Sequence, residues 1–290
     1  MTILLTGATG FLGSHLLHRL LELKYEVVIL KRSTSNIWRI DSVLSKVKSY
    51  DIDKVAIEKP FEDQKIDAVI HTVTNYGRNN SSISNIVDTN LMFSLKLLET
   101  ATFFNTDTFF NTDTLLYKYL NHYSLSKKQF VEWLKYFSDR IKVVNLKLEH
   151  MYGPKDDNTK FVTWITNQML QNVESVDLTE GIQKRDFIYI DDVVDVYLLM
   201  LEKSKIFQAF SEFDVGTGDQ IELKEFILKI YKEISKIKPI STKLNFGAKA
   251  YREGEFMEIE EDVKPLFDLG WKPKISIEDG IKLIIKEAIQ

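Results

Sequence analysis

The feature that most constrains this chain is a set of three glycines spaced three residues apart near the N-terminus. Gly7, Gly10 and Gly13 follow an aliphatic run expected to be a strand, Thr2–Leu5, and open an amphipathic stretch expected to be a helix, Phe11–Leu23. In such a unit the glycines permit a tight turn, a close approach of backbone to ligand, and close packing of helix on sheet. The helix N-terminus also offers backbone N–H groups to an anion. The pattern therefore predicts a dinucleotide-binding α/β fold with the diphosphate at this turn.

The rest of the first half alternates short apolar runs with longer amphipathic stretches. The further expected strands are Glu26–Leu30, Ala68–His71, Thr108–Asn111 and Ile141–Leu146, and the further expected helices are Ser84–Thr102 and Leu116–Tyr136. Apolar strands separated by helices indicate a parallel sheet that is covered on both faces. We therefore predict a doubly wound parallel sheet of the Rossmann type.

The second half is less regular. Expected elements are the helices Lys160–Asn172, Asp191–Lys203, Leu223–Lys236 and Ile277–Ala288 and the strand Ser211–Val215. Because no Pro/Gly/Ser-rich linker separates the halves, we expect a smaller α/β lobe interleaved with the first domain. The predicted cofactor domain is 1–150, completed by about 186–218, and the predicted substrate lobe is 151–185 with 219–290.

Composition excludes several classes of protein. The 290 residues include no cysteine, so disulfides and thiolate metal sites are excluded, and no metal site is expected. Lys and Arg total 38 against 42 Asp and Glu, without a long basic run, which argues against nucleic-acid binding. No apolar run approaches the ~20 residues of a membrane span, and the N-terminus lacks a secretory signal. We therefore expect a cytoplasmic protein that binds neither nucleic acid nor membrane.

The end of the second expected strand carries two cations. An acidic side chain at this position would hold the ribose 2′-hydroxyl of NAD. Here Lys31 and Arg32 precede Ser33, which suits a 2′-phosphate and favours NADP(H), with a solvated basic pair as the alternative. Asp51 and Ile52, at the end of a third strand, are expected beside the adenine.

Tyr123 and Lys127 form a Tyr-x-x-x-Lys pair. On a helix these positions share one face. A phenol with a pKa near ~10 needs a nearby cation to act as an acid or base at neutral pH, and Lys127 is expected to lower the pKa of Tyr123 while bonding the nicotinamide ribose. The residues expected to contact the cofactor are Gly7, Thr9, Gly10, Phe11, Leu12, Lys31, Arg32, Asp51, Ile52, Thr72, Val73, Thr74, Tyr123 and Lys127.

The ordered set of motifs resembles the extended short-chain dehydrogenases/reductases, the NAD-dependent epimerase/dehydratase family that acts on nucleotide sugars. The resemblance runs from residue 1 to about 275. It is carried by the glycine turn, Tyr-x-x-x-Lys, Asp67–His71, Asn90, Met151–Pro154, Arg185–Asp192 and Arg252–Glu255. It implies that a Ser or Thr ending the fifth strand bonds the reacting oxygen.

That resemblance assigns the oxygen contact to Thr112. The hexapeptide Phe103–Thr108 is repeated as Phe109–Thr114, which leaves Thr106 as a rival. Only 11 positions separate Thr112 from Tyr123, fewer than in many relatives. The segment between Thr112 and Tyr123, at the rim of the site, is therefore expected to be shorter than in those relatives. Thr114 then becomes a second possible partner of the reacting oxygen.

The resemblance also implies a substrate site. Arg185 and Arg252 fall where arginines clamp the sugar-nucleotide diphosphate, with surface ion pairs as the alternative. Tyr76 and Arg78 follow the fourth strand and could line the sugar pocket, and His150 is expected close to the sugar.

Three reactions share this scaffold in the family. A 4,6-dehydratase needs Thr-Asp-Glu, but the chain has Thr-Asp-Thr at 112–114, so dehydration is disfavoured. A 4-epimerase keeps NAD bound, which Lys31 and Arg32 argue against. The remaining interpretation is an NADPH-dependent 4-ketoreductase that acts on a 4-keto-6-deoxy sugar. This enzyme would resemble the CDP-abequose and CDP-paratose synthases. It would supply a deoxysugar for surface polysaccharide such as O-antigen. An epimerase or a non-catalytic NADP-sensing protein remains the alternative.

A homodimer is also implied by the resemblance, through a four-helix interface built from Ser84–Thr102 and Leu116–Tyr136. The apolar residues expected on that surface are Leu91, Leu95, Leu98, Phe130, Trp133 and Leu134. The alternative is that they all face the protein's own core.

Overall fold

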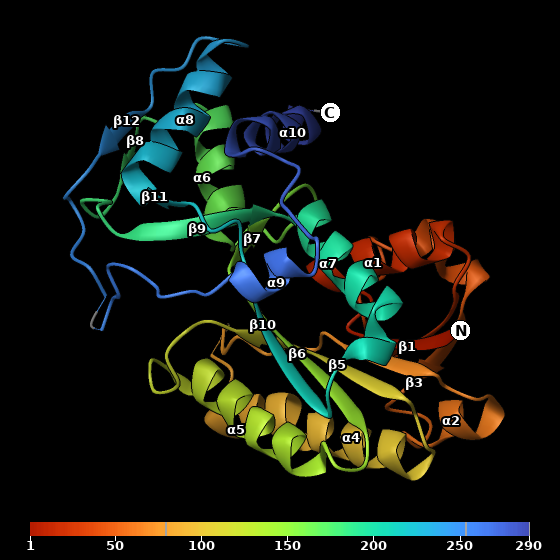
Figure 1. Ribbon diagram of the computed structural model, residues 1–290. Coiled ribbons are helices and arrows are strands. Elements are labelled where there is room, and N and C mark those ends of the chain that lie inside the picture. The colour runs from red at the N-terminus through yellow and green to blue at the C-terminus, as the bar shows by residue number, and fades with distance from the viewer. Residues whose placement is uncertain (79, 253, 290) are drawn as a thin grey trace. The chain divides into compact units, whose positions relative to one another are not determined.

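The computed structural model describes residues 1–78, 80–252 and 254–289. The chain forms two compact units, coloured along the sequence in Figure 1. Unit 1 comprises Met1–Leu148 and Val194–Asp214, and unit 2 comprises Glu149–Val193 and Val215–Gln290. Each unit is therefore discontinuous in sequence, and the chain passes between them three times; the sequence places these passages near 150, 186 and 218.

Unit 1 is built on a seven-stranded sheet of order β10-β6-β5-β4-β1-β2-β3. The strands are β1 (Thr2–Thr6), β2 (Glu26–Lys31), β3 (Lys48–Asp51), β4 (Ala68–His71), β5 (Thr108–Thr114), β6 (Lys142–Leu148) and β10 (Phe210–Val215). Every strand pair from β3 across to β6 is parallel. This is the strand order of the doubly wound Rossmann sheet, so the predicted fold class is confirmed.

Helices cover both faces of this sheet. They are α1 (Phe11–Glu22), η1 (Asp41–Lys46), α2 (Lys59–Asp63), α3 (Ile83–Val87), η2 (Asp88–Phe93), α4 (Ser94–Phe103), α5 (His122–Phe137), α7 (Ile190–Glu202), which begins in unit 2, and η3 (Ser204–Ile206). Figure 1 shows α4 and α5 side by side on one face of the sheet. Their inner residues pack with Phe109 of β5 in one hydrophobic core.

This packing corrects part of the expected dimer surface. Leu98, Phe130 and Leu134 have no exposed area and belong to the protein's own core. Leu91 and Leu95 are half-buried against the same core. Of the six apolar residues expected on the surface, Trp133 alone is exposed.

Two helix boundaries differ from expectation. The helix expected over Leu116–Tyr136 begins only at His122, because Asn121 caps it: its side chain accepts from Ser124 N at 2.9 Å, and Ser124 Oγ accepts from Asn121 N at 3.2 Å. This reciprocal capping box satisfies the free amides of the first turn.

The helix expected over Ser84–Thr102 is interrupted by the π-helical turn η2. That turn buries Asn90, whose side-chain oxygen accepts from Asn75 N at 2.7 Å and whose amide donates to Asn75 O at 2.9 Å and Ser126 Oγ at 3.0 Å. The wide turn therefore ties the segment after β4 to α5, an insertion of the kind often found near functional sites.

Unit 2 contains two small sheets, with strand orders β11-β9-β7 and β12-β8. Its elements are β7 (His150–Tyr152), α6 (Phe161–Leu170), β8 (Ser175–Asp177), β9 (Lys184–Tyr189), β11 (Gln220–Glu222), α8 (Leu223–Ser235), β12 (Lys243–Asn245), α9 (Lys264–Asp268) and α10 (Ile277–Ile289). Phe187 of β9 stacks on Phe226 of α8 at 3.8 Å between ring centroids, which joins sheet to helix. Across the described part of the chain, no helix combines the length and apolar character needed to cross a membrane.

Candidate active site

The glycine turn lies between β1 and α1, at the carboxyl end of the sheet. Gly7 has φ +74°, and a Cβ there would lie 2.5 Å from Thr72 Oγ1, which itself donates to Thr6 O at 2.8 Å. A Cβ on Gly13 would overlap the Gly7 carbonyl oxygen. The turn therefore requires glycine at both positions, and it sits beside the end of β4, where the strand order reverses and Rossmann folds bind their ligands. This cradle fits the diphosphate of a dinucleotide.

A buried histidine that the sequence did not single out supports this turn. His71, the last residue of β4, contacts Thr6 Oγ1 through Nδ1 and Ser94 Oγ through Nε2, both at 2.8 Å. Burial, reinforced by the charge of Lys127, holds the pKa of His71 well below 6.5. The imidazole is therefore neutral and links β1, β4 and α4 through hydrogen bonds.

The cations at the end of β2 are not equally placed. Lys31 forms an ion pair with Asp51, its register partner on β3, and its side chain is 15% exposed. The same carboxylate accepts from Lys54 at 3.1 Å, and the Lys31 hydrogen bond lowers the pKa of Asp51. Arg32 is exposed. The positive charge of Lys31 is therefore partly neutralised by the carboxylate that was expected to contact the adenine.

Ser33 and Ile52, which flank these charges, are also held in place. Ser33 donates from its backbone N to Asp53 at 2.7 Å and also from its hydroxyl. The backbone N of Ile52 donates to Lys31 O at 2.9 Å. Both contacts fix the strand ends around the expected adenosine site.

Tyr123 lies in the first turn of α5, with its ring 5.0 Å from that of Tyr76. Burial raises its pKa well above 10, and the charges of Tyr76 and Asp113 add to the shift, while a hydrogen bond with the Thr114 side chain opposes it. The lowered pKa expected from the sequence is therefore wrong for this structure: loss of water around the phenol, together with the charge of Asp113, outweighs the opposing effect of the Thr114 hydroxyl. Tyr123 stays protonated at neutral pH.

Lys127, one helical turn later, is 1% exposed. Burial lowers its pKa from 10.5 to about 8, with Asp113 raising it and Lys128 lowering it further. No hydrogen-bond acceptor among the described residues reaches its Nζ. A buried ammonium with unsatisfied donors on the face of α5 that carries Tyr123 fits a ribose hydroxyl of a nicotinamide cofactor.

The two threonines at the end of β5 have different partners. Thr112 Oγ1 is hydrogen-bonded to the buried Tyr197 hydroxyl at 2.6 Å. Thr114, the last residue of the strand, accepts from Leu116 N at 3.2 Å, and its hydroxyl is close enough to Tyr123 to lower the pKa of that phenol. Thr106 precedes the start of the strand and so lies at its opposite end. The structure thus brings Thr114, rather than Thr112 or Thr106, to Tyr123.

Asp113 and Lys128 form a buried ion pair between these threonines and α5. Lys128 Nζ donates to Asp113 Oδ2 at 2.8 Å and to the Thr114 carbonyl oxygen, and Asn145 Nδ2 donates to Asp113 at 3.3 Å. The Asp113 side chain has no exposed area. The pair ties the end of β5 to the helix that carries Tyr123, a contact that the sequence pattern does not indicate.

In unit 2, the Arg185 side chain contacts the turn that contains Arg252. The Arg185 guanidinium forms an ion pair with Glu255, whose backbone N donates to Arg252 O at 3.1 Å. Arg185 is 8% exposed, whereas Arg252 is exposed. Glu253 of the same motif lies outside the described residues. The two arginine motifs are therefore adjacent, with Arg185 already paired.

The other predicted substrate residues have local partners. His150 Nδ1 lies 2.9 Å from Glu149 Oε2. In unit 1, the Arg78 guanidinium lies 5.6 Å from the centre of the Tyr76 ring. Thr72, Val73 and Thr74, the segment that leads from β4 to Tyr76, are half-buried.

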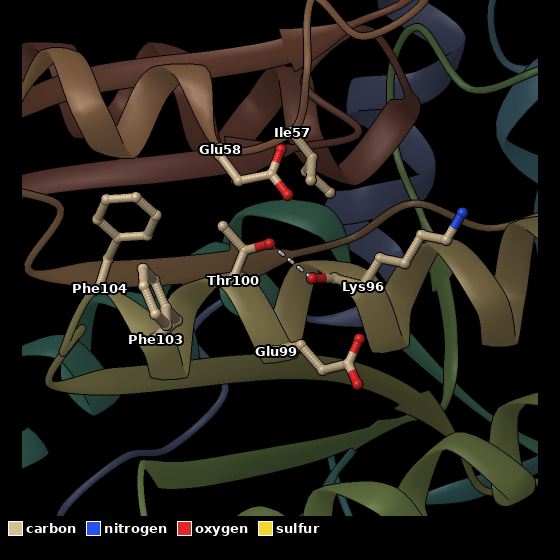
Figure 2. A pocket seen from close by; sticks show the side chains of 7 residues that line it. All are labelled: Ile57, Glu58, Lys96, Glu99, Thr100, Phe103 and Phe104. Atoms are coloured by element: carbon tan, nitrogen blue, oxygen red, sulfur yellow. Dashed lines mark hydrogen bonds between the residues drawn. The ribbon is translucent and has the colours of Figure 1, made fainter.

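A surface hollow of about 580 Å³ lies elsewhere in unit 1. It is lined by Ile57, Glu58, Lys96, Glu99, Thr100, Phe103 and Phe104, shown in Figure 2. In this view Thr100 donates to the carbonyl oxygen of Lys96 along α4, at 2.8 Å. None of the predicted site residues lines this hollow, so it is separate from the candidate active site.

Comparison with known proteins gives a consistent picture. The family model described as NAD dependent epimerase/dehydratase family matches residues 3–216. The CDP-abequose synthases of Salmonella muenchen and Salmonella typhimurium are 38% and 34% identical to this chain over 98% of its length, covering 96% and 97% of their own.

Among solved structures, the UDP-glucose 4-epimerase of Thermotoga maritima with UDP-glucose aligns with a TM-score of 0.85 and 25% identity, covering 100% of this chain and 99% of the other. The fold also matches Pal from Bacillus thuringiensis, at a TM-score of 0.86 and 21% identity over 100% of this chain and 99% of that one. The glycine turn, the Tyr-x-x-x-Lys pair and these alignments lead to one conclusion: this chain belongs to the NAD dependent epimerase/dehydratase family.

Proposed function

We propose that the chain is an NADPH-dependent reductase that acts on the 4-keto group of a nucleotide-activated, CDP-linked 4-keto-6-deoxy sugar. The product would be a deoxysugar for surface polysaccharide. Support comes from the near full-length similarity to the two CDP-abequose synthases. It also comes from the sequence at 112–114, where the glutamate of a dehydratase is replaced by Thr114.

The observation that carries the proposal is the buried Lys127 Nζ, which has no acceptor among the described residues and lies one helical turn after Tyr123 on α5. Reduction of a ketone needs a proton donor at the oxygen, and the Tyr123 phenol can donate while the Lys127 ammonium stabilises the phenolate that is left. When bound, a reduced nicotinamide supplies the hydride. Tyr123 then gives its proton to the carbonyl oxygen, and the Thr114 hydroxyl holds that oxygen in place.

Lys127 has two roles in this proposal. Its Nζ would bond the ribose of the cofactor, which satisfies its buried donors. Its positive charge would then stabilise the tyrosinate that remains after proton transfer. With its pKa near 8, Lys127 is mainly protonated at neutral pH.

At the nucleotide end, we propose that Arg252 and Arg185 bind the diphosphate of the substrate. A guanidinium can bond two phosphate oxygens at once. Arg252 is exposed, whereas Arg185 would have to exchange its bond to Glu255 for one to phosphate. We expect Arg252→Ala to weaken substrate binding by about ten- to a hundredfold without changing affinity for NADPH. Tyr76, Arg78 and His150 are proposed sugar contacts on the family resemblance.

The second candidate is a nucleotide-sugar 4-epimerase with tightly bound NAD. It is favoured by the full-length structural match to a UDP-glucose 4-epimerase. A non-catalytic NADP sensor is the third alternative, which the presence of both Tyr123 and Lys127 disfavours.

The test is NADPH oxidation, followed by absorbance, across a panel of nucleotide 4-keto-6-deoxy sugars. The proposal expects stoichiometric NADPH consumption that is fastest with the CDP sugar, and none with Tyr123→Phe. An epimerase would instead interconvert nucleotide hexoses without net consumption of cofactor. If neither activity is found, the non-catalytic NADP sensor becomes the better-supported function.

A further inference from the structure

We propose that Lys128 is a positioning residue for the reduction, which holds the end of β5 against α5 so that Thr114 and Tyr123 meet at the substrate oxygen. This inference rests on the proposed function, because it takes those two side chains as the groups at the reacting carbonyl. It concerns the lysine that directly follows Lys127, to which the proposed mechanism gives no contact with cofactor or substrate.

The two groups at the reacting carbonyl come from different elements. Thr114 is the last residue of β5, and Tyr123 lies in the first turn of α5. The stretch 115–121 between them, which the structure describes in full, forms no helix or strand and exposes Tyr117 and Tyr119. The connecting chain alone therefore leaves the distance between the two hydroxyls loosely defined. A displacement of about 1 Å at a reacting centre can lower a rate about a hundredfold, so this distance needs a support.

The Lys128 side chain provides that support through two hydrogen bonds. Its Nζ donates to Asp113 Oδ2 at 2.8 Å and to the carbonyl oxygen of Thr114. One ammonium from the helix that carries Tyr123 thus contacts the last two residues of β5. Fixing the Thr114 carbonyl also fixes the origin of its side chain, whose hydroxyl is close enough to Tyr123 to lower the pKa of that phenol.

Burial makes this contact rigid. The Asp113 side chain has no exposed area, and Lys128 is half-buried. Asn145 of β6 donates from Nδ2 to the same Asp113 oxygen at 3.3 Å. Charge-assisted hydrogen bonds in a low-dielectric interior hold their geometry more strictly than pairs in water. The end of β5 is therefore held from β6 on one side and from α5 on the other.

A purely stabilising role for the ion pair makes a different prediction. The double substitution Asp113→Asn with Lys128→Met removes both buried charges, so most of the stability lost in Lys128→Met should return. It does not restore the hydrogen bond to the Thr114 carbonyl oxygen. Stability and turnover should therefore separate in the double variant if Lys128 positions Thr114, and should change together if it does not.

The experiment compares the full-length wild type with Asp113→Asn, Lys128→Met, the double variant and Lys128→Arg. The control is Lys135→Met, which changes an exposed lysine further along α5. For each protein we would measure kcat and KM for CDP-4-keto-6-deoxyglucose at saturating NADPH. The dissociation constant of NADPH and the urea midpoint of unfolding are measured in parallel. Lys128→Arg keeps the charges paired if the double variant does not fold.

We expect kcat of the double variant to fall by about ten- to a hundredfold, while KM and the NADPH dissociation constant change by less than about threefold. Its urea midpoint should lie closer to that of wild type than to that of Lys128→Met. Asp113→Asn should retain most of kcat, because Lys128 can still reach the Thr114 carbonyl oxygen. Lys128→Arg should fall between wild type and the double variant, since a guanidinium donates to the same oxygens from a different, planar geometry. Lys135→Met should resemble wild type.

The failures of the two proposals are distinguishable. If wild type reduces the CDP sugar and the double variant keeps the wild-type kcat, the role of Lys128 is overturned while the proposed reductase stands. A kcat that follows the urea midpoint across all variants, or an equal loss of turnover and of NADPH affinity, would overturn it as well, since either pattern indicates a structural role. If wild type consumes no NADPH with the CDP sugar, the proposed function itself fails, and this inference fails with it.

Discussion

Lys127 shows at the scale of one residue how a site can reduce the stability of the protein that contains it. Its ammonium is buried without an acceptor among the described residues, and its pKa falls from 10.5 to about 8. We expect Lys127→Met to abolish reductase activity and to raise the unfolding free energy of the cofactor-free protein at pH 7 by about 3 kcal/mol, the cost of holding that charge in the interior. Chemical denaturation measures the second effect, with exposed Lys46→Met as the control.

The pH dependence of that difference has a definite sign. Because the folded pKa lies below the unfolded value, the unfolded chain binds more protons at Lys127 between pH 8 and 10.5. The stability of wild type therefore rises with pH through this window, and the penalty is complete below pH 8. The advantage of Lys127→Met should thus be constant below pH 8 and shrink as pH rises toward 10.5. An advantage independent of pH would show that packing, not charge, is responsible.

Two threonines on one strand should respond differently to the same change. Thr114→Val removes the hydroxyl next to Tyr123, and we expect kcat to fall about ten- to a hundredfold with little loss of stability, because the other Thr114 partner, the Leu116 amide, lies in a surface loop. Thr112→Val leaves the buried Tyr197 hydroxyl without its partner and should cost about 1–3 kcal/mol with kcat nearly intact. Steady-state kinetics and urea unfolding of both variants check this; the reverse pattern would restore Thr112 to the site.

At the scale of elements, the Asp113–Lys128 pair sets the junction between β5 and α5. Lys128→Met leaves a carboxylate with no exposed area facing only the Asn145 amide, and we expect a loss of about 3–5 kcal/mol in unfolding free energy. Asp113→Asn combined with Lys128→Met should recover most of that loss, because it removes the buried charge. Urea denaturation of the two single variants and the double variant gives the coupling. Losses that simply add would contradict a direct pair.

The sequence predicts a helix or strand well where its bounds are set by the apolar periodicity and turn residues of the segment itself. The glycine turn, β1 and α1 appear close to their expected bounds, since the apolar pattern and the glycines suffice. The start of α5 at His122 is set by the capping box of Asn121 and Ser124, which the apolar periodicity after Leu116 does not indicate. The π-helical turn around Asn90 could not be read from periodicity, since it depends on partners at Asn75 and Ser126.

At the scale of the whole molecule, the Rossmann sheet followed from continuous apolar strands alternating with helices. Unit 2 was less predictable, because its strands are short, as in β7, β8 and β11, and each is defined by its pairing partners rather than by its own pattern. The sequence also ordered the motifs correctly without showing their contacts. It could not show that Glu255 lies between Arg185 and Arg252, or that Lys31 is paired, since those facts depend on tertiary structure.

The exposed aromatic residues of α4 and α5 bear on whether the protein forms a dimer. With Leu98, Phe130 and Leu134 in the core, the outer faces of α4 and α5 still expose Phe103 (79%), Tyr136 (62%) and Trp133 (41%). Large aromatic residues are enriched at the centres of protein interfaces. We therefore expect light scattering to give a mass twice the 33.8 kDa of one chain.

The partner surface can be tested with one substitution. Trp133→Glu places a charge on the outer face of α5 without touching the core, and a dimer through α4 and α5 should dissociate to monomers at micromolar concentration, because burial of an unpaired carboxylate costs several kcal/mol. The control is Ile206→Glu, which changes another exposed apolar residue, on η3, and should leave the mass unchanged. Because Tyr123 lies on the same helix, the Trp133→Glu monomer should also show whether α5 needs the partner to hold its first turn: if kcat with saturating NADPH is retained, the site is complete within one chain. A wild-type protein that scatters as a monomer at the same concentration would contradict the dimer.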